Sequence, residues 1–88
     1  MTSKIIEYDL CSPGANYDAL YEAINSFGPW AHITESTWLV KTDSTCVQIR
    51  DKLLVKMDAN DRLFVAELTG AAAWHNVICS NEFLSKYL

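Results

Sequence analysis

Asp9 is the first residue whose type and position suggest chemistry. It stands near the end of the apolar run KIIEYDL (residues 4–10), and the turn-forming residues CSPG follow. Mg²⁺ takes oxygen ligands, keeps several of its waters and needs only one or two carboxylates from the protein. One Asp per subunit, doubled across a two-fold axis, meets that need. The alternative is that Asp9 caps the following turn through its own side chain.

Four other polar side chains could take part in a reaction. Glu7 falls on the same strand face as Asp9, so it either joins that site or faces water. Histidine is the commonest general base, but His32 lies inside a predicted strand and His75 follows a tryptophan. A packed or surface role is therefore expected for both. Ser36 belongs to no Gly-x-Ser-x-Gly elbow, which favours a hydrogen bond at a strand bend over a nucleophile.

The cysteines, at positions 11, 46 and 79, are odd in number and far apart in the sequence. This spacing fits neither a disulfide framework nor a zinc site. It predicts a reducing, cytoplasmic compartment.

A strand and a helix are expected to position Asp9. The run 4–10 is rich in β-branched and aromatic residues and predicts a strand. Asn16 can cap the helix that follows, and Gly28 with Pro29 is expected to end it. The apolar residues of this helix recur every three or four positions, which places them on one face: Tyr17, Leu20, Tyr21, Ile24 and Phe27.

The middle of the chain predicts a second β region and a second helix. Residues 30–42 form either two short strands with a turn near Glu35 and Ser36 or one bent strand. A helix is expected over 43–57, opened by a capping box between Thr45 and Gln48. Its inward face is expected to hold Cys46, Ile49, Leu53, Leu54 and Met57.

The last third predicts one more strand and a helical tail. Residues 62–70 are apolar on both sides apart from Glu67, which indicates a central strand. Ser80 or Asn81 can cap a short closing helix. That helix carries Phe83, Leu84 and Tyr87, and we expect Trp74, Val77 and Ile78 to pack against the rest of the domain.

These elements follow the order β-α-β-β-α-β and predict one α+β domain over residues 1–88. The expected arrangement is ferredoxin-like, with one antiparallel sheet, both helices on one face and a short C-terminal helical tail. The other face of the sheet also needs cover. A second copy of the chain is the first candidate for that cover, and the tail is the other.

The charge of the chain does not favour nucleic acid as a partner. Seven Lys and Arg residues stand against eleven Asp and Glu residues, and the net charge is −4. Nucleic-acid-binding proteins usually carry a basic surface, whereas this chain has no basic run. Four cations fall close in sequence and form either a local patch or a solvated helix face: Lys41, Arg50, Lys52 and Lys56.

Aromatic content favours a homodimer. Three Trp, four Tyr and three Phe in 88 residues exceed what a small monomer core readily hides, and aromatics are enriched in interface cores. Trp30, Trp38 and Trp74 could also stack nucleobases, but core or dimer contacts are favoured. No apolar stretch approaches membrane-spanning length, so no membrane partner is expected.

Four stretches, in this order, resemble the small proteins of the "SinR family", relatives of the small CRISPR adaptation nuclease family (Cas two). They are YDL (8–10), ESTWLV (35–40), IRDKL (49–53) and TGAAAW (69–74). The resemblance covers nearly the whole chain. It implies a ferredoxin-like homodimer in which Asp9 lies near the dimer axis and binds a metal, with Ser36 matching the family's serine.

The resemblance implies a metal-dependent endonuclease that acts on RNA or DNA, with Asp9 and Ser36 as catalytic residues and Mg²⁺ as the metal. VapD-type toxins, which cleave RNA, share this fold. The chain departs from the CRISPR proteins in its Gly28-Pro29-Trp30 segment, its helical tail and its acidity. Two alternatives therefore stay open: a non-catalytic module of a toxin–antitoxin or defence system that binds a basic protein, and a dimeric scaffold without a site.

Overall fold

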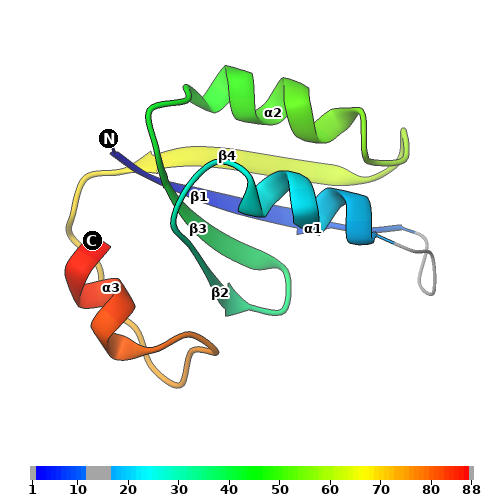
Figure 1. The fold of residues 1–88 in the computed structure, drawn as a ribbon. Coiled ribbons are helices and arrows are strands. Elements are labelled where there is room, and N and C mark those ends of the chain that lie inside the picture. The colour runs from blue at the N-terminus through cyan, green and yellow to red at the C-terminus, as the bar shows by residue number, and fades with distance from the viewer. Residues whose placement is uncertain (1, 12–16, 88) are drawn as a thin grey trace.

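The computed structural model describes residues 2–11 and 17–87 (Figure 1). Within these residues the chain is a small α+β protein with a four-stranded antiparallel sheet and three helices. In chain order the elements are β1 (Thr2–Asp9), α1 (Asp18–Asn25), β2 (Trp30–Thr34), β3 (Thr37–Thr42), α2 (Cys46–Leu54), β4 (Arg62–Leu68) and α3 (Asn81–Tyr87). None of the described helices has the length and apolar character needed to cross a membrane.

The sheet order is β2-β3-β1-β4, and every neighbouring pair is antiparallel. β1 lies in the middle and pairs with β3 from Thr2↔Thr42 to Glu7↔Thr37. It pairs with β4 from Ser3↔Leu68 to Asp9↔Arg62. The region 30–42 is two strands joined by a tight turn, with an irregularity in the pairing between His32 and Thr34.

β4 is an edge strand, so the predicted central position is wrong. The apolar residues on the two faces of β4 lie in different surroundings. Leu63 and Val65 pack against the main core, whereas Phe64, on the opposite face, is exposed. Apolar residues on both sides of this strand therefore show neither that both of its faces are buried nor that both of its edges are paired.

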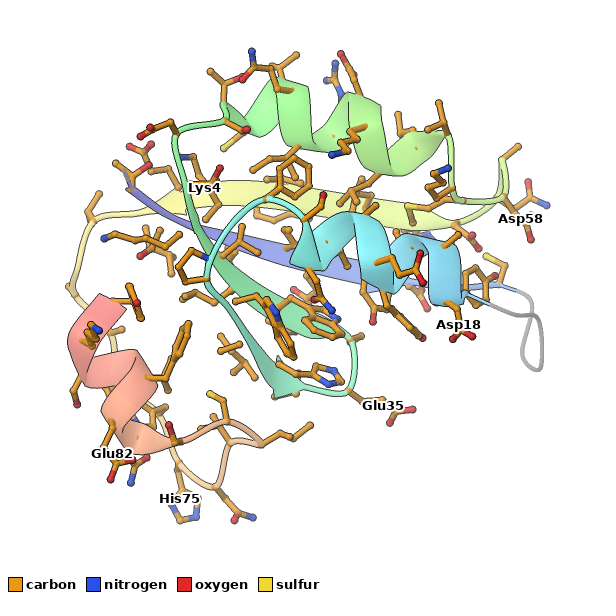
Figure 2. All side chains as sticks on the ribbon, in the orientation of Figure 1. Lys4, Asp18, Glu35, Asp58, His75 and Glu82 are labelled. Carbon is orange, nitrogen blue, oxygen red and sulfur yellow. The ribbon has the colours of Figure 1, made fainter. Side chains whose placement is uncertain are left out.

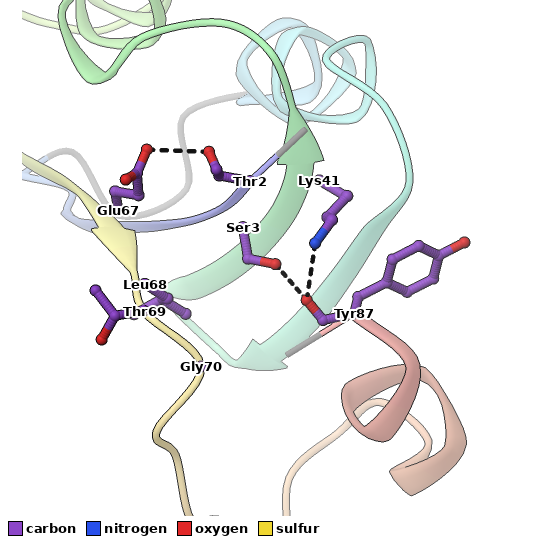
Figure 3. Close-up of a pocket in the computed structure, with 8 residues that line it drawn as sticks. All are labelled: Thr2, Ser3, Lys41, Glu67, Leu68, Thr69, Gly70 and Tyr87. Carbon is purple, nitrogen blue, oxygen red and sulfur yellow. Dashed lines mark hydrogen bonds between the residues drawn. The ribbon is translucent and has the colours of Figure 1, made fainter.

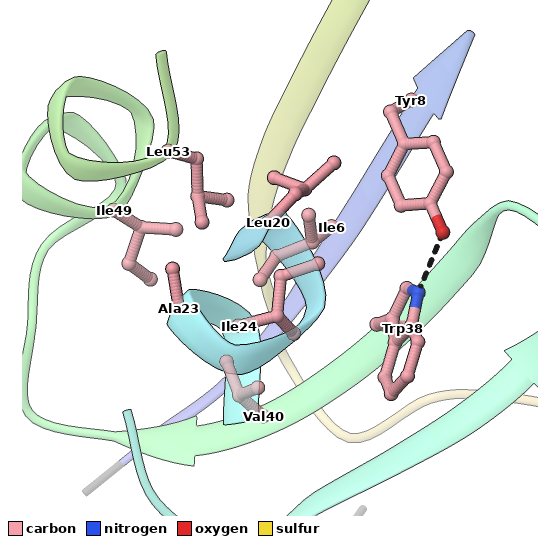
Figure 4. Packing of buried hydrophobic residues seen from close by; sticks show 9 residues of the cluster. All are labelled: Ile6, Tyr8, Leu20, Ala23, Ile24, Trp38, Val40, Ile49 and Leu53. Carbon is pink, nitrogen blue, oxygen red and sulfur yellow. Dashed lines mark hydrogen bonds between the residues drawn. The ribbon is translucent and has the colours of Figure 1, made fainter. Parts of the chain in front are cut away.

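α1 and α2 lie together over one face of the sheet (Figure 1). Figure 4 shows the core between them and the strands. Its fully buried members come from four elements and are Ile6, Leu20, Ile24, Val40, Ile49 and Leu53. Burying one such side chain contributes about 1.5–3 kcal/mol, so this layer is the main source of stability.

The helix signals of the sequence are largely confirmed. The apolar face of α1 is turned inward, but Asn16, its expected cap, lies outside the described residues. In α2 the capping box is present, because Thr45 Oγ1 accepts from the Gln48 amide at 3.1 Å and Gln48 Oε1 accepts from the Thr45 amide at 2.9 Å. α2 is shorter than expected, and Leu54 is exposed rather than inward-facing.

A glycine is needed at position 28 because the chain passes close to the backbone of β3 there. Its φ is +149°, and a Cβ there would collide with the backbone carbonyl oxygen of Lys41. The Lys41 amide also donates to the Pro29 carbonyl at 2.8 Å. Gly28 therefore lets the chain turn tightly against β3 at the start of β2.

The C-terminal helix covers part of the second face of the sheet. Leu84 of α3 is buried, and the Tyr87 carbonyl accepts hydrogen bonds from Ser3 Oγ and, at 3.4 Å, from Lys41 Nζ (Figure 3). The Ser80 hydroxyl caps α3 by accepting from the Phe83 amide at 3.2 Å. A pocket of about 370 Å³ remains beside this contact.

The segment before α3 is more exposed than expected. Ile78 is 63% exposed and Trp74 is 37% exposed, so the prediction that both pack against the domain is wrong for Ile78 and only partly right for Trp74. The Ile78 amide instead donates to the Ile33 carbonyl at 2.9 Å, beside the β2 edge. A main-chain hydrogen bond, not side-chain burial, holds this residue.

Candidate functional site

Asp9 is the last residue of β1 and lies opposite Arg62 on β4. Asp9 Oδ2 accepts from Arg62 Nη1 at 2.8 Å. Both side chains are mostly exposed, at 67% for Asp9 and 78% for Arg62. A pair this exposed stabilises by about 0–1 kcal/mol, so another ligand can displace Arg62 at small cost. The alternative, that Asp9 caps the following turn, falls mostly outside the described residues.

Asp9 has one neighbouring carboxylate on its own face of β1. Glu7 lies on the same sheet face as Asp9 and is exposed. Across the described residues no three His, Cys, Asp or Glu side chains come together as a metal-binding group. Because Mg²⁺ needs only one or two protein carboxylates, the oxygen donors at this end of β1 match that ion in type and number.

Ser36 lies in the turn between β2 and β3 and faces the same pocket as Asp9. The pocket has a volume of about 330 Å³ and is lined by Tyr8, Asp9, Leu10, Tyr21, Glu35 and Ser36. The Ser36 carbonyl accepts from the Tyr8 amide at 3.2 Å. The expected hydrogen bond at the strand bend therefore exists, but the main chain makes it. The fold thus brings together the two residues that the sequence singled out.

A network of aromatic residues supports this pocket. The Tyr8 hydroxyl accepts from Trp38 Nε1 at 2.9 Å and donates to the Glu35 carbonyl at 3.4 Å. Burial raises the pKa of Tyr8, the hydrogen bond from Trp38 opposes this, and the nearby Tyr21 and Glu35 raise the pKa further. Tyr8 therefore stays protonated at neutral pH and acts as a fixed hydrogen-bonding bridge.

The histidines have the packing and surface roles that were expected. The His32 ring stacks on Trp38, with ring centroids 4.1 Å apart and planes 8° apart, and His32 Nε2 is 2.9 Å from the Glu35 carbonyl oxygen. His75 is exposed in the segment before α3. Neither ring is hydrogen-bonded to Ser36, which supports the view that Ser36 is not an activated nucleophile.

The tryptophans and cysteines also have mainly structural positions. Trp38 is buried, and Trp30 packs against it with ring centroids 5.4 Å apart while remaining 44% exposed. All three cysteines are free. Cys11 is exposed, with Sγ 2.9 Å from the Asn60 carbonyl oxygen, and Cys46 is half-buried at the start of α2.

The cations between 41 and 56 do not form one surface. Lys41 lies on the sheet face away from α2, where it binds the Tyr87 carbonyl. On α2, Arg50 pairs with Asp51, and Lys52 donates to Ser26 Oγ at 3.0 Å. The patch expected from their sequence proximity is therefore divided between two faces.

Reading the sequence missed two residues near Asp9: its ion-pair partner Arg62 and a residue that shares its pocket, Glu35. Arg62 is 53 residues away and becomes its neighbour only through the β1–β4 register. Glu35 joins the same pocket only through the β2–β3 turn. The alternation of apolar residues in β1 could have predicted part of this site, because it places Tyr8 and Asp9 on opposite faces at the end of the strand.

Comparison with known proteins gives no relative for this chain: no family model, curated protein or solved structure matches it.

Proposed function

We propose that the chain is a ferredoxin-like homodimer, similar to the CRISPR adaptation proteins, that cleaves RNA or DNA with Mg²⁺ held by Asp9 of both subunits. The order β2-β3-β1-β4 with antiparallel neighbours supports the ferredoxin-like assignment. So does the position of α1 and α2 on one face of the sheet (Figure 1).

This proposal depends mainly on one observation: α3 leaves part of the second face of the sheet uncovered. We call it the open strip: Ile5, Glu7 and Asp9 of β1, with Arg62, Phe64 and Ala66 of β4, which the register places side by side. Phe64 is 63% exposed at its centre. A second copy packed over Phe64 by a two-fold axis would bury this ring and bring the two Asp9 side chains toward each other.

The chain's own residues have distinct roles in this proposal. Bound Mg²⁺ would polarise a phosphoryl oxygen and lower the pKa of a bound water. The two Asp9 carboxylates would hold the ion. Arg62, released from Asp9, would present a planar fork of N–H donors to the phosphate. Ser36, on the opposite wall of the adjoining pocket, would position the substrate through its hydroxyl.

The test combines oligomeric state with cleavage. We expect the purified protein to be a dimer by light scattering and to cleave single-stranded RNA or DNA when Mg²⁺ is present. Asp9→Asn should reduce cleavage by about 100-fold or more, since it removes one ligand from each subunit. Glu82→Gln, at an exposed carboxylate of α3, is the matched control and should be as active as the original chain.

Phe64→Asp tests the interface independently of the chemistry. It places a charge at the centre of the open strip and should give a folded monomer without cleavage. A wild-type monomer, or cleavage that persists in Asp9→Asn, would overturn the proposal.

The second candidate is a non-catalytic module that binds a basic protein, in a toxin–antitoxin or defence setting. Two observations favour it: the net charge of −4 and the presence of both Asp9 and Glu35 on one aromatic pocket. Two carboxylates repel phosphates and attract cations. A dimer that lacks cleavage but retains a basic protein in a salt-sensitive complex would select this candidate.

A further inference from the structure

The pocket beside Asp9 is built from three parts of the chain. β1 contributes Tyr8 and Asp9, α1 contributes Tyr21, and the β2–β3 turn contributes Glu35 and Ser36. At about 330 Å³ it lies at the lower end of the range typical of small-ligand pockets. It combines carboxylates with aromatic walls, and none of the described residues that line it is Lys or Arg.

Hydrogen bonds fix the walls of this pocket. The Tyr8 amide binds the Ser36 carbonyl at 3.2 Å, so the turn is attached to the end of β1. The Glu35 carbonyl accepts from the Tyr8 hydroxyl at 3.4 Å and lies 2.9 Å from His32 Nε2. The pocket is therefore formed before any ligand arrives, which lowers the entropic cost of binding.

The side chains favour a planar cation as ligand. Figure 2 shows Glu35 at the tip of the β2–β3 hairpin, with its carboxylate projecting into solvent at the rim of the pocket. The pKa of Tyr8 is raised mainly by burial, and the Glu35 carboxylate adds only a small part of that rise. The stronger reason to expect a cation is that Glu35 and Asp9 line the same pocket. The half-buried Tyr21 ring adds a surface on which a cation can stack.

Asp9 already binds one guanidinium group in the folded chain. It binds the guanidinium of Arg62 at 2.8 Å from the side of β4, and its carboxylate also lines the pocket on the side of the turn. A carboxylate can accept from more than one donor, because its two oxygens offer about four lone-pair positions. A second guanidinium can therefore bind Asp9 without displacing Arg62.

We propose that this pocket binds an arginine side chain of a basic partner protein, with the guanidinium held by the Glu35 and Asp9 carboxylates and stacked on Tyr21. Arginine fits better than lysine, because its planar fork matches two carboxylates and an aromatic ring at once. This inference rests on the second function proposed above and is an alternative to the nuclease, because both would use Asp9 and the same pocket.

The experiment uses small probes in place of the unidentified partner. N-acetyl-arginine methylamide is titrated into the ¹⁵N-labelled full chain and followed by amide chemical shifts. The lysine and citrulline counterparts are titrated in parallel. We expect saturable shifts at the end of β1, in α1 and in the β2–β3 turn, weaker shifts with lysine and none with citrulline, which has the same shape but no charge.

Variants then assign the binding to the pocket. Glu35→Gln, on an exposed side chain, should weaken arginine binding about tenfold because a charge-assisted hydrogen bond is lost. Tyr21→Leu keeps an apolar wall but removes the aromatic ring, and should also weaken binding. Glu82→Gln is the control and should bind as the original chain does.

The inference is wrong if citrulline shifts the same amides as arginine, or if Glu35→Gln binds arginine unchanged. It is also wrong if a nucleoside monophosphate, and not arginine, shifts these residues. Failure of the second function would look different: arginine would still bind the pocket, while a basic protein would form no salt-sensitive complex with the chain.

Discussion

Replacing Tyr8 with Phe tests whether the hydrogen-bonded bridge holds the pocket together. The substitution keeps the ring, which is 6% exposed, and removes only the hydroxyl. Trp38 Nε1 then loses its acceptor in a buried position, whereas the Glu35 carbonyl keeps its contact with His32. The dominant cost is therefore one unsatisfied buried donor, about 1–3 kcal/mol.

That cost is a substantial share of the total stability. At roughly 0.05–0.15 kcal/mol per residue, the 88 residues correspond to a free energy of unfolding of about 4–13 kcal/mol. For a domain of this size each kcal/mol lowers Tm by about 4–8 °C. We therefore expect Tyr8→Phe to lower the midpoint of urea unfolding and to lower Tm by at least about 4 °C, with an unchanged m-value.

The assay is urea unfolding followed by tryptophan fluorescence, with Tyr87→Phe as the matched control. Tyr87 is half-buried on α3, and Figure 3 shows its hydroxyl directed away from the pocket drawn there. Its loss should change stability by less than about 0.5 kcal/mol. A double-mutant cycle with Trp38→Phe should give a coupling energy of about 0.5–3 kcal/mol. A loss below 0.5 kcal/mol in Tyr8→Phe, or additive effects in the cycle, would refute the bridge.

Three further predictions concern the framework. Gly28→Ala should cost at least about 2 kcal/mol in urea unfolding, because the new Cβ meets the Lys41 carbonyl and the backbone keeps a positive φ; a neutral result would contradict that geometry. Leu84→Ala should lower the free energy of unfolding by about 2–5 kcal/mol and make the chain more sensitive to a protease, because α3 is held less firmly. An unchanged rate of proteolysis would show that Leu84 does not hold the helix. Since the pKa of Tyr8 is raised in the folded state, the unfolded chain loses that proton first as pH rises above about 10. Stability should therefore fall with increasing pH in that range, and this fall should be smaller in Tyr8→Phe.

Acid pH should destabilise the chain through two other carboxylates. The pKa of Asp61 is lowered mainly by the Cys11 amide, with help from the Asp58 amide and the Tyr17 hydroxyl. The pKa of Glu67 is lowered by the Thr2 hydroxyl and by Lys4. Both carboxylates stabilise the fold fully when the pH is above their ordinary pKa. This stabilisation is lost as the pH falls through their lowered pKa in the folded chain. Acid unfolding of Asp61→Asn and Glu67→Gln should therefore depend less on pH than that of the original chain.

Much of the local structure could be predicted from the sequence, because its causes lie within a few residues. The capping box of α2 joins Thr45 to Gln48, three positions apart. The inward face of α1 follows from the spacing of Leu20 and Ile24. The turn at Glu35 and Ser36 and the cap at Ser80 were each one of two alternatives that the sequence left open, and the structure selected between them.

The sequence by itself therefore determined which segments form helices and strands, most of the inward face of each long helix, and that Asp9 lies near the end of a strand. Only the tertiary structure decided what surrounds Asp9. Its contact with Arg62 spans 53 residues, and its pocket needs the β2–β3 turn to close against β1. The edge position of β4 and the exposure of Leu54 were decided in the same way. The physical reason is that side-chain periodicity acts along a single element, whereas strand order and register depend on which distant segments the whole chain can bury together.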